Sequence, residues 1–449
     1  MAVEIPLEVL IKQRLEEDTW WIEYVGPFTI FRVPANIREA NRSLYEPRMV
    51  SIGPYYHHLR KDRLRAMEDQ KWRLLRSFLC RNSEHRVEAY VKAVRSLEKD
   101  ARQSYSEFIS LGQDEFVQML LLDGCFILEL FFKWLNEDPD ILFKEGWGPT
   151  TIFSDLLLFE NQIPFFIIEK LYDIVVAGEV GSSRDAFLSL LAKFLMDEEP
   201  SHPSSVTWPE RIHHLLDLHH RFLIVPSLCR EEKHHDPTAL PLWKQRLIHW
   251  ITPRPDQRGV KRPPRQIPCA TELYEAGVKF RKKQSPKNLF DVKFSQGTLE
   301  IPPLQIDSNK KALLTNLVAL ERHKTWGDQT VTSYVALMDS LINTKEDVAL
   351  LQHAGVIHNM LSSHQEAAVF FNRLGDGTSF DTMNHHFAKL FRNVQLYYDS
   401  NWNRSWARLI HDYFNSPWAV ISVIAGMILL GLSALQTFYT VYPYYRPRS

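Results

Sequence analysis

The sequence predicts a mainly α-helical protein, in which a large helical domain with a small β-hairpin element is followed by one C-terminal transmembrane helix. Glycine is scarce, at 17 residues against 25 prolines, which disfavours folds built on tight hairpins and glycine-lined phosphate loops. Residues 114–135 are apolar on nearly every side, as in a central helix of a large core. Residues 413–445 contain no charged side chain, which is typical of a membrane span.

The composition is that of a folded protein. The chain is 45% hydrophobic and 24% charged, whereas disordered chains have few apolar residues and a large net charge. Its 53 basic and 54 acidic residues give a formal net charge of -1, so we expect no nucleic-acid partner. The four cysteines include no Cys-x-x-Cys pair and are expected to be free thiols.

Three further helices follow from periodicity and capping. Apolar side chains in residues 86–105 recur at spacings of three and four, which predicts an amphipathic helix. Ser363 and Glu366 form a capping-box signal, and Gly375 is a suitable end for the helix that follows. An apolar stripe over residues 387–413 predicts a long helix that leads to the membrane.

The strongest strand signal is a β-hairpin. Residues 290–295 alternate apolar and polar side chains, and Gln296-Gly297 then turns the chain into the apolar residues of 299–301. Residues 29–33 and 49–52 also have an extended pattern and could join the hairpin in one sheet.

A proline-rich segment interrupts the helical domain. Residues 197–268 hold 11 of the 25 prolines, which predicts an insertion or linker with one helical island at 240–251. Residues 254–287 carry ten basic and three acidic side chains, and this basic continuation predicts either contact with anionic lipid or a solvated loop. We therefore predict an N-terminal segment at 1–19 and an α-rich domain in two parts, 20–196 and 269–415, separated by the insertion at 197–268. A transmembrane helix at 416–441 and a short tail at 442–449 follow.

The C-terminal apolar stretch has the length and the ends of a membrane span. Residues 418–441 would extend about 36 Å as a helix, against a hydrocarbon core of roughly 30 Å. Ser422 and Gly426 form a small-x-x-x-small pair that could bring two spans together in a homodimer. The expected anchor residues are Trp418, Gly426, Gly431 and Tyr439.

The predicted location is a membrane, crossed once near the C-terminus, with the plasma membrane preferred to an endomembrane. The N-terminus has no apolar signal-peptide core, and basic residues tie at two on each side of the span. We therefore expect the large domain in the cytosol. Two glycosylation sequons, Asn41-Arg42-Ser43 and Asn403-Arg404-Ser405, argue for the opposite side.

The usual signatures of enzymes are missing. The chain has no Gly-x-Ser-x-Gly elbow, Gly-Lys-Ser/Thr phosphate loop, Gly-x-Gly-x-x-Gly turn or His-Glu-x-x-His motif. Adjacent histidines at 213–214 and 219–220 are five to seven positions apart, which does not suit one helix face. We therefore predict no catalytic residue, no cofactor, no metal site and no small-molecule substrate.

Two acidic positions stand out as candidate functional residues. Asp123 lies inside the most apolar helix, where burial raises the pKa of a carboxyl unless a partner compensates. The alternative is a buried acid satisfied by a lysine, an arginine or a backbone amide. Glu160, Asn161 and Gln162 precede Ile163-Pro164, so they either cap a restarting helix or contribute to a polar site.

Several motifs resemble, in order along the chain, those of the plant domain-of-unknown-function 247 family. They are Ser51-Ile52-Gly53-Pro54-Tyr55, Met67-Glu68 with Lys71, Ala101-Arg102 with Tyr105, Asp123-Gly124-Cys125-Phe126, Leu158-Phe159-Glu160-Asn161-Gln162-Ile163-Pro164, Glu275-Ala276-Gly277, Asn316-Leu317, Ser333-Tyr334-Val335 and Pro417-Trp418. Tyr56 stands where the family usually has histidine, and Phe159 where leucine is commoner.

The resemblance implies a plant protein with an α-rich domain and a C-terminal membrane anchor, and it implies no catalytic residue. Some grass relatives are associated with self-incompatibility loci, which suggests a recognition role. The motif positions, whose role the resemblance leaves open, are Gly53, Pro54, Glu68, Lys71, Arg102, Asp123, Glu160, Asn161, Gln162 and Pro164.

Our leading hypothesis is therefore a membrane-anchored, non-enzymatic protein that interacts with or recognises another protein. Its expected partners are the lipid bilayer, a protein and a second copy of the chain. One alternative is a self-incompatibility-type recognition determinant. The other is an enzyme with a carboxylate-based site around Asp123 and Glu160.

Overall fold

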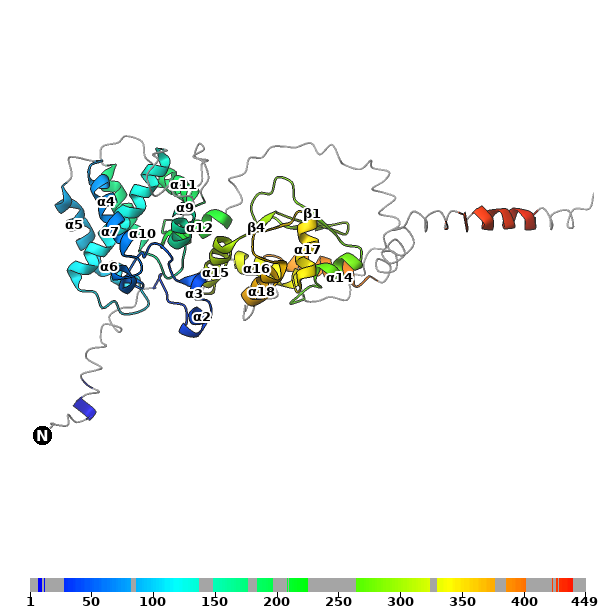
Figure 1. Ribbon diagram of the computed structural model, residues 1–449, viewed down its shortest axis with the longest axis horizontal. Helices are drawn as coiled ribbons and strands as arrows, with labels where there is room; N and C mark the ends of the chain where they lie inside the picture. Colours follow the sequence, from blue (N-terminus) through cyan, green and yellow to red (C-terminus); the bar gives the residue numbers. More distant parts are fainter. Residues whose placement is uncertain are drawn as a thin grey trace, which may run out of the picture. The chain divides into compact units, whose positions relative to one another are not determined.

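The computed structural model divides the chain into two compact units (Figure 1). Unit 1 comprises Met1–Glu231 and Asp307–Gly327, and unit 2 comprises Glu232–Ile306 and Asp328–Ser449. The structure describes residues 7–9, 12, 28–81, 86–136, 148–176, 184–196, 208, 210–224, 264–323, 329–375, 385–400, 422, 425–426 and 428–438. Both units are mainly helical, and the strands of both small sheets lie in unit 2, so the predicted α-rich class with a small sheet element is confirmed.

Unit 1 consists of helices and the connections between them. Its elements are α2 (Ala35–Ala40), α3 (Arg42–Tyr45), the 3-10 helix η2 (His57–Lys61), α4 (Arg65–Leu79), α5 (Val87–Ser96), α6 (Glu98–Gln103), α7 (Gln113–Leu135), α9 (Gly148–Leu156), α10 (Phe165–Val175), α11 (Arg184–Leu195), α12 (Leu215–Ile224) and α15 (Ser308–His323).

Helix α7 forms the centre of unit 1, as the sequence predicts. Fifteen of its residues are buried, so every side of its middle faces other protein groups. Helices α4, α5, α10 and α11 pack against it. A side chain at Gly124 would overlap Leu171 of α10, so glycine permits α7 and α10 to approach closely here.

The amphipathic segment 86–105 forms two helices instead of one. The chain leaves the helical conformation at Leu97, between α5 and α6. Tyr90 and Val94 of α5 and Ala101 of α6 are fully buried, so the break directs the apolar residues of both helices into the core.

Residues 29–33 and 49–52 do not join the hairpin, so that prediction is wrong. Ile30 forms only an isolated parallel bridge with Tyr105, and residues 49–52 belong to no strand. Side chains bind the amides of Met49, Val50 and Ile52 and the carbonyls of Val50 and Ser51, as described below, in place of a neighbouring strand.

Unit 2 combines helices with two small sheets. Its elements are α14 (Ala270–Glu275), β1 (Lys279–Lys282), β2 (Lys293–Ser295), β3 (Thr298–Ile301), β4 (Leu304–Ile306), α16 (Thr330–Leu341), α17 (Lys345–His353), β5 (Ile357–Asn359), α18 (His364–Gly375) and α19 (Ala388–Tyr398). The first sheet has the order β1-β3-β2, with β1 parallel and β2 antiparallel to β3. In the second, β4 and β5 are parallel.

The predicted hairpin and the predicted helix cap at Ser363 are both present in unit 2. Strands β2 and β3 are joined by Gln296 and Gly297, whose φ angles of 50° and 74° suit a two-residue hairpin turn. The amide of Glu366 donates to the Ser363 hydroxyl at 3.1 Å before α18, and Gly375 is the last residue of that helix. These local signals therefore predicted both boundaries correctly.

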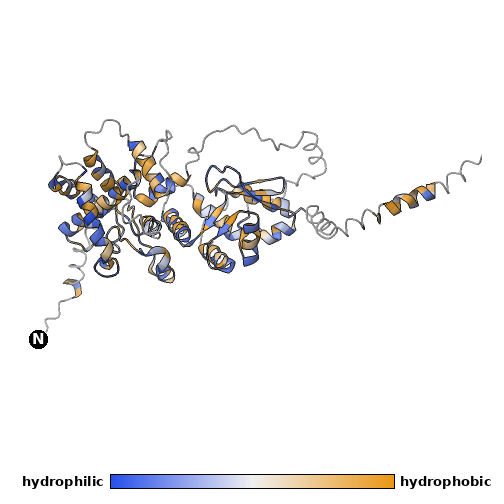
Figure 2. Ribbon diagram, turned by 45° about the horizontal axis from the view of Figure 1, so that its top comes forward, coloured by the Kyte–Doolittle hydropathy of each residue, from blue (hydrophilic) through white to orange (hydrophobic). Residues whose placement is uncertain are grey.

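The predicted transmembrane helix is contradicted. Within the described ranges no helix is long and apolar enough to cross a membrane. The continuous helical run at this end, hydrophobic in most positions (Figure 2), is 428–438. The prediction of a single-pass, C-terminally anchored membrane protein is therefore wrong.

The structure describes two of the four expected anchor residues. Gly426 and Gly431 are helical, and an added Cβ at either would meet no described atom within 4 Å. Trp418 and Tyr439 lie outside the described residues.

The proline-rich segment 197–268 is described only in part. It contains α12, a helix that the sequence did not predict, whose first six residues are buried in unit 1. The predicted helical island at 240–251 lies outside the described residues. The boundaries of the predicted insertion stay predictions.

Candidate functional site

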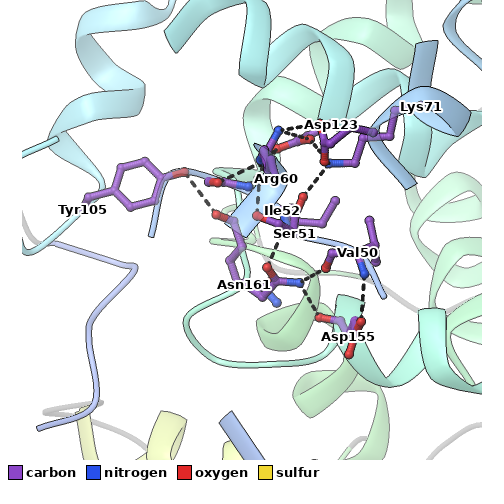
Figure 3. Close-up of polar contacts among 12 residues, drawn as sticks. Val50, Ser51, Ile52, Arg60, Lys71, Tyr105, Asp123, Asp155 and Asn161 are labelled. Carbon is purple, nitrogen blue, oxygen red and sulfur yellow. Dashed lines mark hydrogen bonds and ion pairs between the residues drawn. The ribbon is translucent and has the colours of Figure 1, made fainter. Parts of the chain in front are cut away.

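The carboxylate of Asp123 lies at the centre of a buried polar cluster in unit 1 (Figure 3). Arg60 binds both of its oxygens, with Nη2 2.6 Å from Oδ2 and Nη1 3.1 Å from Oδ1. Lys71 donates to Oδ1 at 2.7 Å, and the amide of Gly53 donates to Oδ2 at 2.8 Å. The expected alternative, an acid satisfied by basic side chains and a backbone amide, is therefore what the structure shows.

Lys71 connects this carboxylate with two other groups. Its Nζ donates to the Ser51 carbonyl at 2.5 Å and lies 2.7 Å from Oε1 of Glu68. Glu68 also accepts from Arg60 at 3.4 Å. Two cations and two carboxylates thus balance in a place where an unpaired charge would be very costly.

The charge pairs determine the protonation states of the cluster. Burial by itself raises the pKa of Asp123, but the adjacent positive charges of Arg60 and Lys71 outweigh it and hold that pKa below its usual value. Burial and the charge of Arg60 lower the pKa of Lys71. Asp123 is therefore held ionised near neutral pH, and an ionised carboxylate is a poor general acid there.

The segment 48–53 is held by side chains in place of a β-ladder. The amides of Arg48, Met49 and Val50 all donate to the carboxylate of Asp155, at 2.6–3.1 Å. Asn161 accepts from the amide of Ile52 at 2.7 Å and donates to the Val50 carbonyl at 3.0 Å. Buried polar side chains therefore satisfy a backbone that contacts no neighbouring strand.

Asp155 differs from Asp123 because its partners are mainly backbone amides. Burial raises its pKa, and the three amide donors oppose that shift without cancelling it. Arg48 is the nearest cation, with Nε 4.0 Å from Oδ1. The sequence did not single out Asp155, although it carries the same signal as Asp123, an acid within an apolar stretch.

Position 53 requires glycine because the backbone there lies close to the Gln162 carbonyl. Its φ of 72° lies in the left-handed region, and an added Cβ would overlap the Gln162 carbonyl oxygen. The same carbonyl accepts from the Tyr105 hydroxyl at 3.1 Å. The adjacent Pro54 is half-buried, and its carbonyl accepts from the amide of His57 at 3.1 Å, where η2 begins.

Glu160 forms a second buried polar cluster. It accepts from the amide of Val33 at 2.7 Å and from the Tyr56 hydroxyl at 2.9 Å. Arg38 and Arg32 lie 3.3 and 3.5 Å from its oxygens. Burial and the negative charge of Glu160 raise the pKa of Tyr56. Tyr56, where the family usually has histidine, thus supplies a hydrogen-bond donor to this acid.

The two acidic candidates do not form one site. Among the described residues, Asp123 and Glu160 share none of the partners named above, and each has its own set of donors. The structure brings Asp123 together with Gly53, Glu68 and Lys71, and leaves Glu160 in a different cluster. A joint carboxylate pair is therefore not formed.

Asn161 and Gln162 cap the preceding helix, so the predicted cap of a restarting helix is wrong. Helix α10 begins after Pro164, and no side chain caps its first turn. Instead, Gln162 donates to the carbonyls of Leu156 and Leu158 at 2.8 and 2.7 Å, where α9 ends. Proline at 164 needs no amide donor there, which explains why the cap is dispensable.

Arg102 is a separate structural residue. Its guanidinium pairs with Glu98, donates to the carbonyls of Ile109 and Leu111 at 2.9 and 2.8 Å, and lies 4.4 Å from the centre of the Phe116 ring. It therefore holds the connection between α6 and α7.

The adjacent histidines of α12 have different surroundings. His220 lies 2.7 Å from Glu321 of α15, whereas His219 is buried and neither ring nitrogen has a hydrogen-bond partner in the described part of the chain. Burial, with the charges of Lys310 and His220, lowers the pKa of His219 to about 3. The ranges that the structure covers contain no cluster of three or more histidine, cysteine or acidic residues suited to a metal.

Two important contributors were not predicted from the sequence. Arg60, which binds Asp123, lies 63 positions away from it, and no local signal distinguishes this arginine from the others. Asn316 of α15 accepts from the amide of Phe159 at 2.8 Å and donates to the Leu44 carbonyl at 2.8 Å. In the sequence, Asn316 stood out only as part of the family motif Asn316-Leu317, which predicted no role for it.

These observations define an α-rich protein whose motif residues hold its scaffold. Residues 30–432 match the model of the plant domain-of-unknown-function 247 family, described as plant protein of unknown function. The chain belongs to this family, and the resemblance is confirmed. No solved structure matches the chain.

Two relatives from Arabidopsis thaliana cover most of the chain. UPF0481 protein At3g47200 is 33% identical over 432 residues, which cover 92% of this chain and 86% of that protein. Putative UPF0481 protein At3g02645 is 25% identical over 484 residues, with 92% and 90% covered. Because each covers 92% of the chain, these similarities extend across both units.

Proposed function

We propose that the chain is a non-enzymatic protein-interaction module, in which the buried polar clusters hold the fold and the partner is another protein. The main support is the environment of Asp123. Both oxygens of this fully buried carboxylate are bound by structural donors, so the strongest candidate for an acid–base residue is committed to the scaffold.

Glu160 supports the same conclusion. It is 1% exposed and is bound by an amide, a phenol and two guanidinium groups. A general acid or base must reach the proton that it transfers, within a hydrogen-bond distance or through one water. More specifically, we propose that the interaction serves recognition, as suggested for some grass relatives.

Proximity labelling in plant cells tests the interaction function. The full chain, tagged at either end, is compared with the tag alone at matched expression. We expect a discrete set of proteins labelled by both tagged forms and absent from the control, including one that binds the purified chain directly. Labelling indistinguishable from that of the tag alone contradicts the proposal.

A second measurement separates this function from the enzyme alternative. Asp123→Asn and Glu160→Gln should each lower the Tm, because both carboxylates support the fold. The enzyme alternative requires instead that one substitution abolish a measurable turnover at an unchanged Tm. That result would reject the non-enzymatic proposal.

A further inference from the structure

The three-stranded sheet of unit 2 has one exposed, basic face. In the pairing register, Arg281 of β1, Glu300 of β3 and Lys293 of β2 lie side by side. Lys279 lies two positions before Arg281, opposite Thr298, and therefore points to the same face. Lys279, Arg281 and Lys293 are all exposed, whereas Glu300 is half-buried.

The opposite face belongs to the core of unit 2. Leu299 and Ile301 of β3 are fully buried there, and the ring of Phe294 lies edge-on to Tyr397 of α19 at 5.6 Å. An added Cβ at Gly355 would lie 3.7 Å from Cβ of Lys282. In β3, buried Leu299 and Ile301 alternate with half-buried Thr298 and Glu300, and this alternation assigns the basic face to solvent, although Lys282 on the opposite face of β1 is exposed as well.

The three exposed cations carry uncompensated charge. No ion pair is formed by Lys279, Arg281 or Lys293 with any residue in the described ranges. Lys283, on the same face, differs because its Nζ lies 2.5 Å from Asp291 and is nearly buried. Glu300 is the acid between Arg281 and Lys293, so the exposed group keeps a positive balance.

Strand β1 also has a free backbone edge. It is an outer strand of the sheet, and the described residues include no strand on its far side. The amides of Lys279 and Lys283 donate to Gly297 and Ile301 of the β3 side, both at about 2.8–2.9 Å. In a parallel pair this alternation leaves the backbone groups of Phe280 and Lys282 directed outward.

We infer that the outer edge of β1 binds an acidic protein segment as an added fourth strand, with its carboxylates beside Lys279 and Arg281. This inference rests on the proposed interaction function and names the surface and chemistry of the partner. Backbone bonds to Phe280 and Lys282 would provide affinity, and the alternating side chains would provide specificity.

The spacing of the cations fits such a segment. Side chains two positions apart on a strand are separated by about 6.6 Å, and adjacent strands by about 4.8 Å. An extended peptide with Asp or Glu at alternate positions therefore places successive carboxylates opposite Lys279 and Arg281. Opposite charges in cross-strand pairs favour this register.

A peptide fits this face better than a nucleic acid does. Glu300 interrupts the cations, and it would repel a continuous polyphosphate, whereas a peptide can place a neutral residue nearby. The free amides and carbonyls of β1 also match a peptide backbone.

Peptide binding by the purified full chain tests the inference. The probe is a fluorescent ten-residue peptide that alternates Glu with Val or Thr, and the readout is anisotropy. We expect binding that weakens at least tenfold when Glu is replaced by Gln, or when alternate residues are N-methylated to block strand pairing. Lys279→Gln with Arg281→Gln should weaken it equally.

A matched double variant controls for net charge. Lys61→Gln with Arg65→Gln removes one lysine and one arginine exposed on unit 1, and it should leave peptide binding unchanged. Equal losses in both double variants, or unchanged binding in the β1 variant, overturn the inference. A single-stranded oligonucleotide that binds more tightly than the peptide, and loses binding in the β1 variant, also overturns it.

Failure here is distinguishable from failure of the proposed function. If the protein partner found by proximity labelling binds the β1 double variant as well as the unchanged chain, the interaction function stands and this surface is wrong.

Discussion

The guanidinium of Arg60 binds Asp123 through two hydrogen bonds, 2.6 and 3.1 Å long, although the residues are 63 positions apart in sequence. The pair joins η2, which follows the turn at Gly53, to the central helix α7. Because both side chains are buried, neither charge can be satisfied by water if the other is removed. The energetic consequences of this pairing can be measured.

Replacing Asp123 by Asn should destabilise the protein strongly. The substitution keeps the shape of the side chain but leaves Arg60 and Lys71 with one carboxylate, Glu68, between them. We expect a loss of about 3 kcal/mol or more in the free energy of unfolding, measured with denaturant. Asp114→Asn, on the exposed start of the same helix, should cost less than about 1 kcal/mol. Equal effects at the two positions would refute the structural role of the pair.

Gly53→Ala should be among the most destabilising small substitutions. Alanine there would have to adopt a φ of 72° while its Cβ overlaps the Gln162 carbonyl. We expect a cost above about 2 kcal/mol, because conformational strain and overlap both contribute. Gly112, at φ -58° with open space around it, is the control, and its replacement by alanine should change stability by less than about 1 kcal/mol. A tolerated alanine at 53 would show that the turn is not needed.

The buried His219 should make stability depend on pH. Its pKa is about 3 in the folded protein, against about 6.5 in an unfolded chain, so the unfolded state binds more protons between those values. The free energy of unfolding should therefore fall as the pH falls from 6.5 towards 3, by up to about 1.4 kcal/mol per pH unit from this residue.

Comparing variants isolates this contribution. Between about pH 5.5 and 6.5 carboxyl groups of ordinary pKa are almost fully ionised, so His219→Leu should flatten the pH dependence of stability in that window. His58→Leu, at an exposed histidine, should leave the slope unchanged. The explanation fails if the two variants have the same slope as the unchanged chain.

Asp347 should stabilise unit 2 by binding backbone amides at the starts of α14 and α17. Its carboxylate accepts from the amides of Thr344 and Thr271, both at 2.9 Å, and from the Thr344 hydroxyl at 3.0 Å, which ties α14 to the start of α17. We expect Asp347→Asn to cost about 1–3 kcal/mol in unfolding experiments. The neighbouring exposed Glu346 makes a suitable comparison, because Glu346→Gln should be nearly neutral. Similar losses at both positions would disprove the capping role.

Local signals predicted the elements that depend on nearby residues. Helix α7, the turn at Gln296-Gly297 and the cap at Ser363 each follow from a few adjacent side chains, and all three are present. The buried position of Asp123 and the kinds of group that satisfy it were also predictable, because an acid in an apolar helix requires donors.

Features that depend on distant residues were not predictable. The choice of Arg60 as partner, the parallel pairing of β1 with β3 and the burial of α12 all arise from contacts between separate parts of the chain. The role of Gln162 was misjudged because its side chain turns back to α9 instead of forward to α10. The membrane prediction relied on the length and the ends of an uncharged apolar stretch, and no helix of the described residues is long and apolar enough to cross a membrane.

The segment 48–53 should also exchange its amide hydrogens with solvent more slowly than its lack of regular secondary structure suggests. Amides outside helices and strands ordinarily exchange their hydrogens quickly, since small local openings expose them. The amides of Val50, Ile52 and Gly53 donate hydrogen bonds to buried carboxylate and amide side chains. These amides can exchange only when the surrounding helices separate. Although they lie outside any helix or strand, their hydrogens should therefore exchange as slowly as those in the interior of α7.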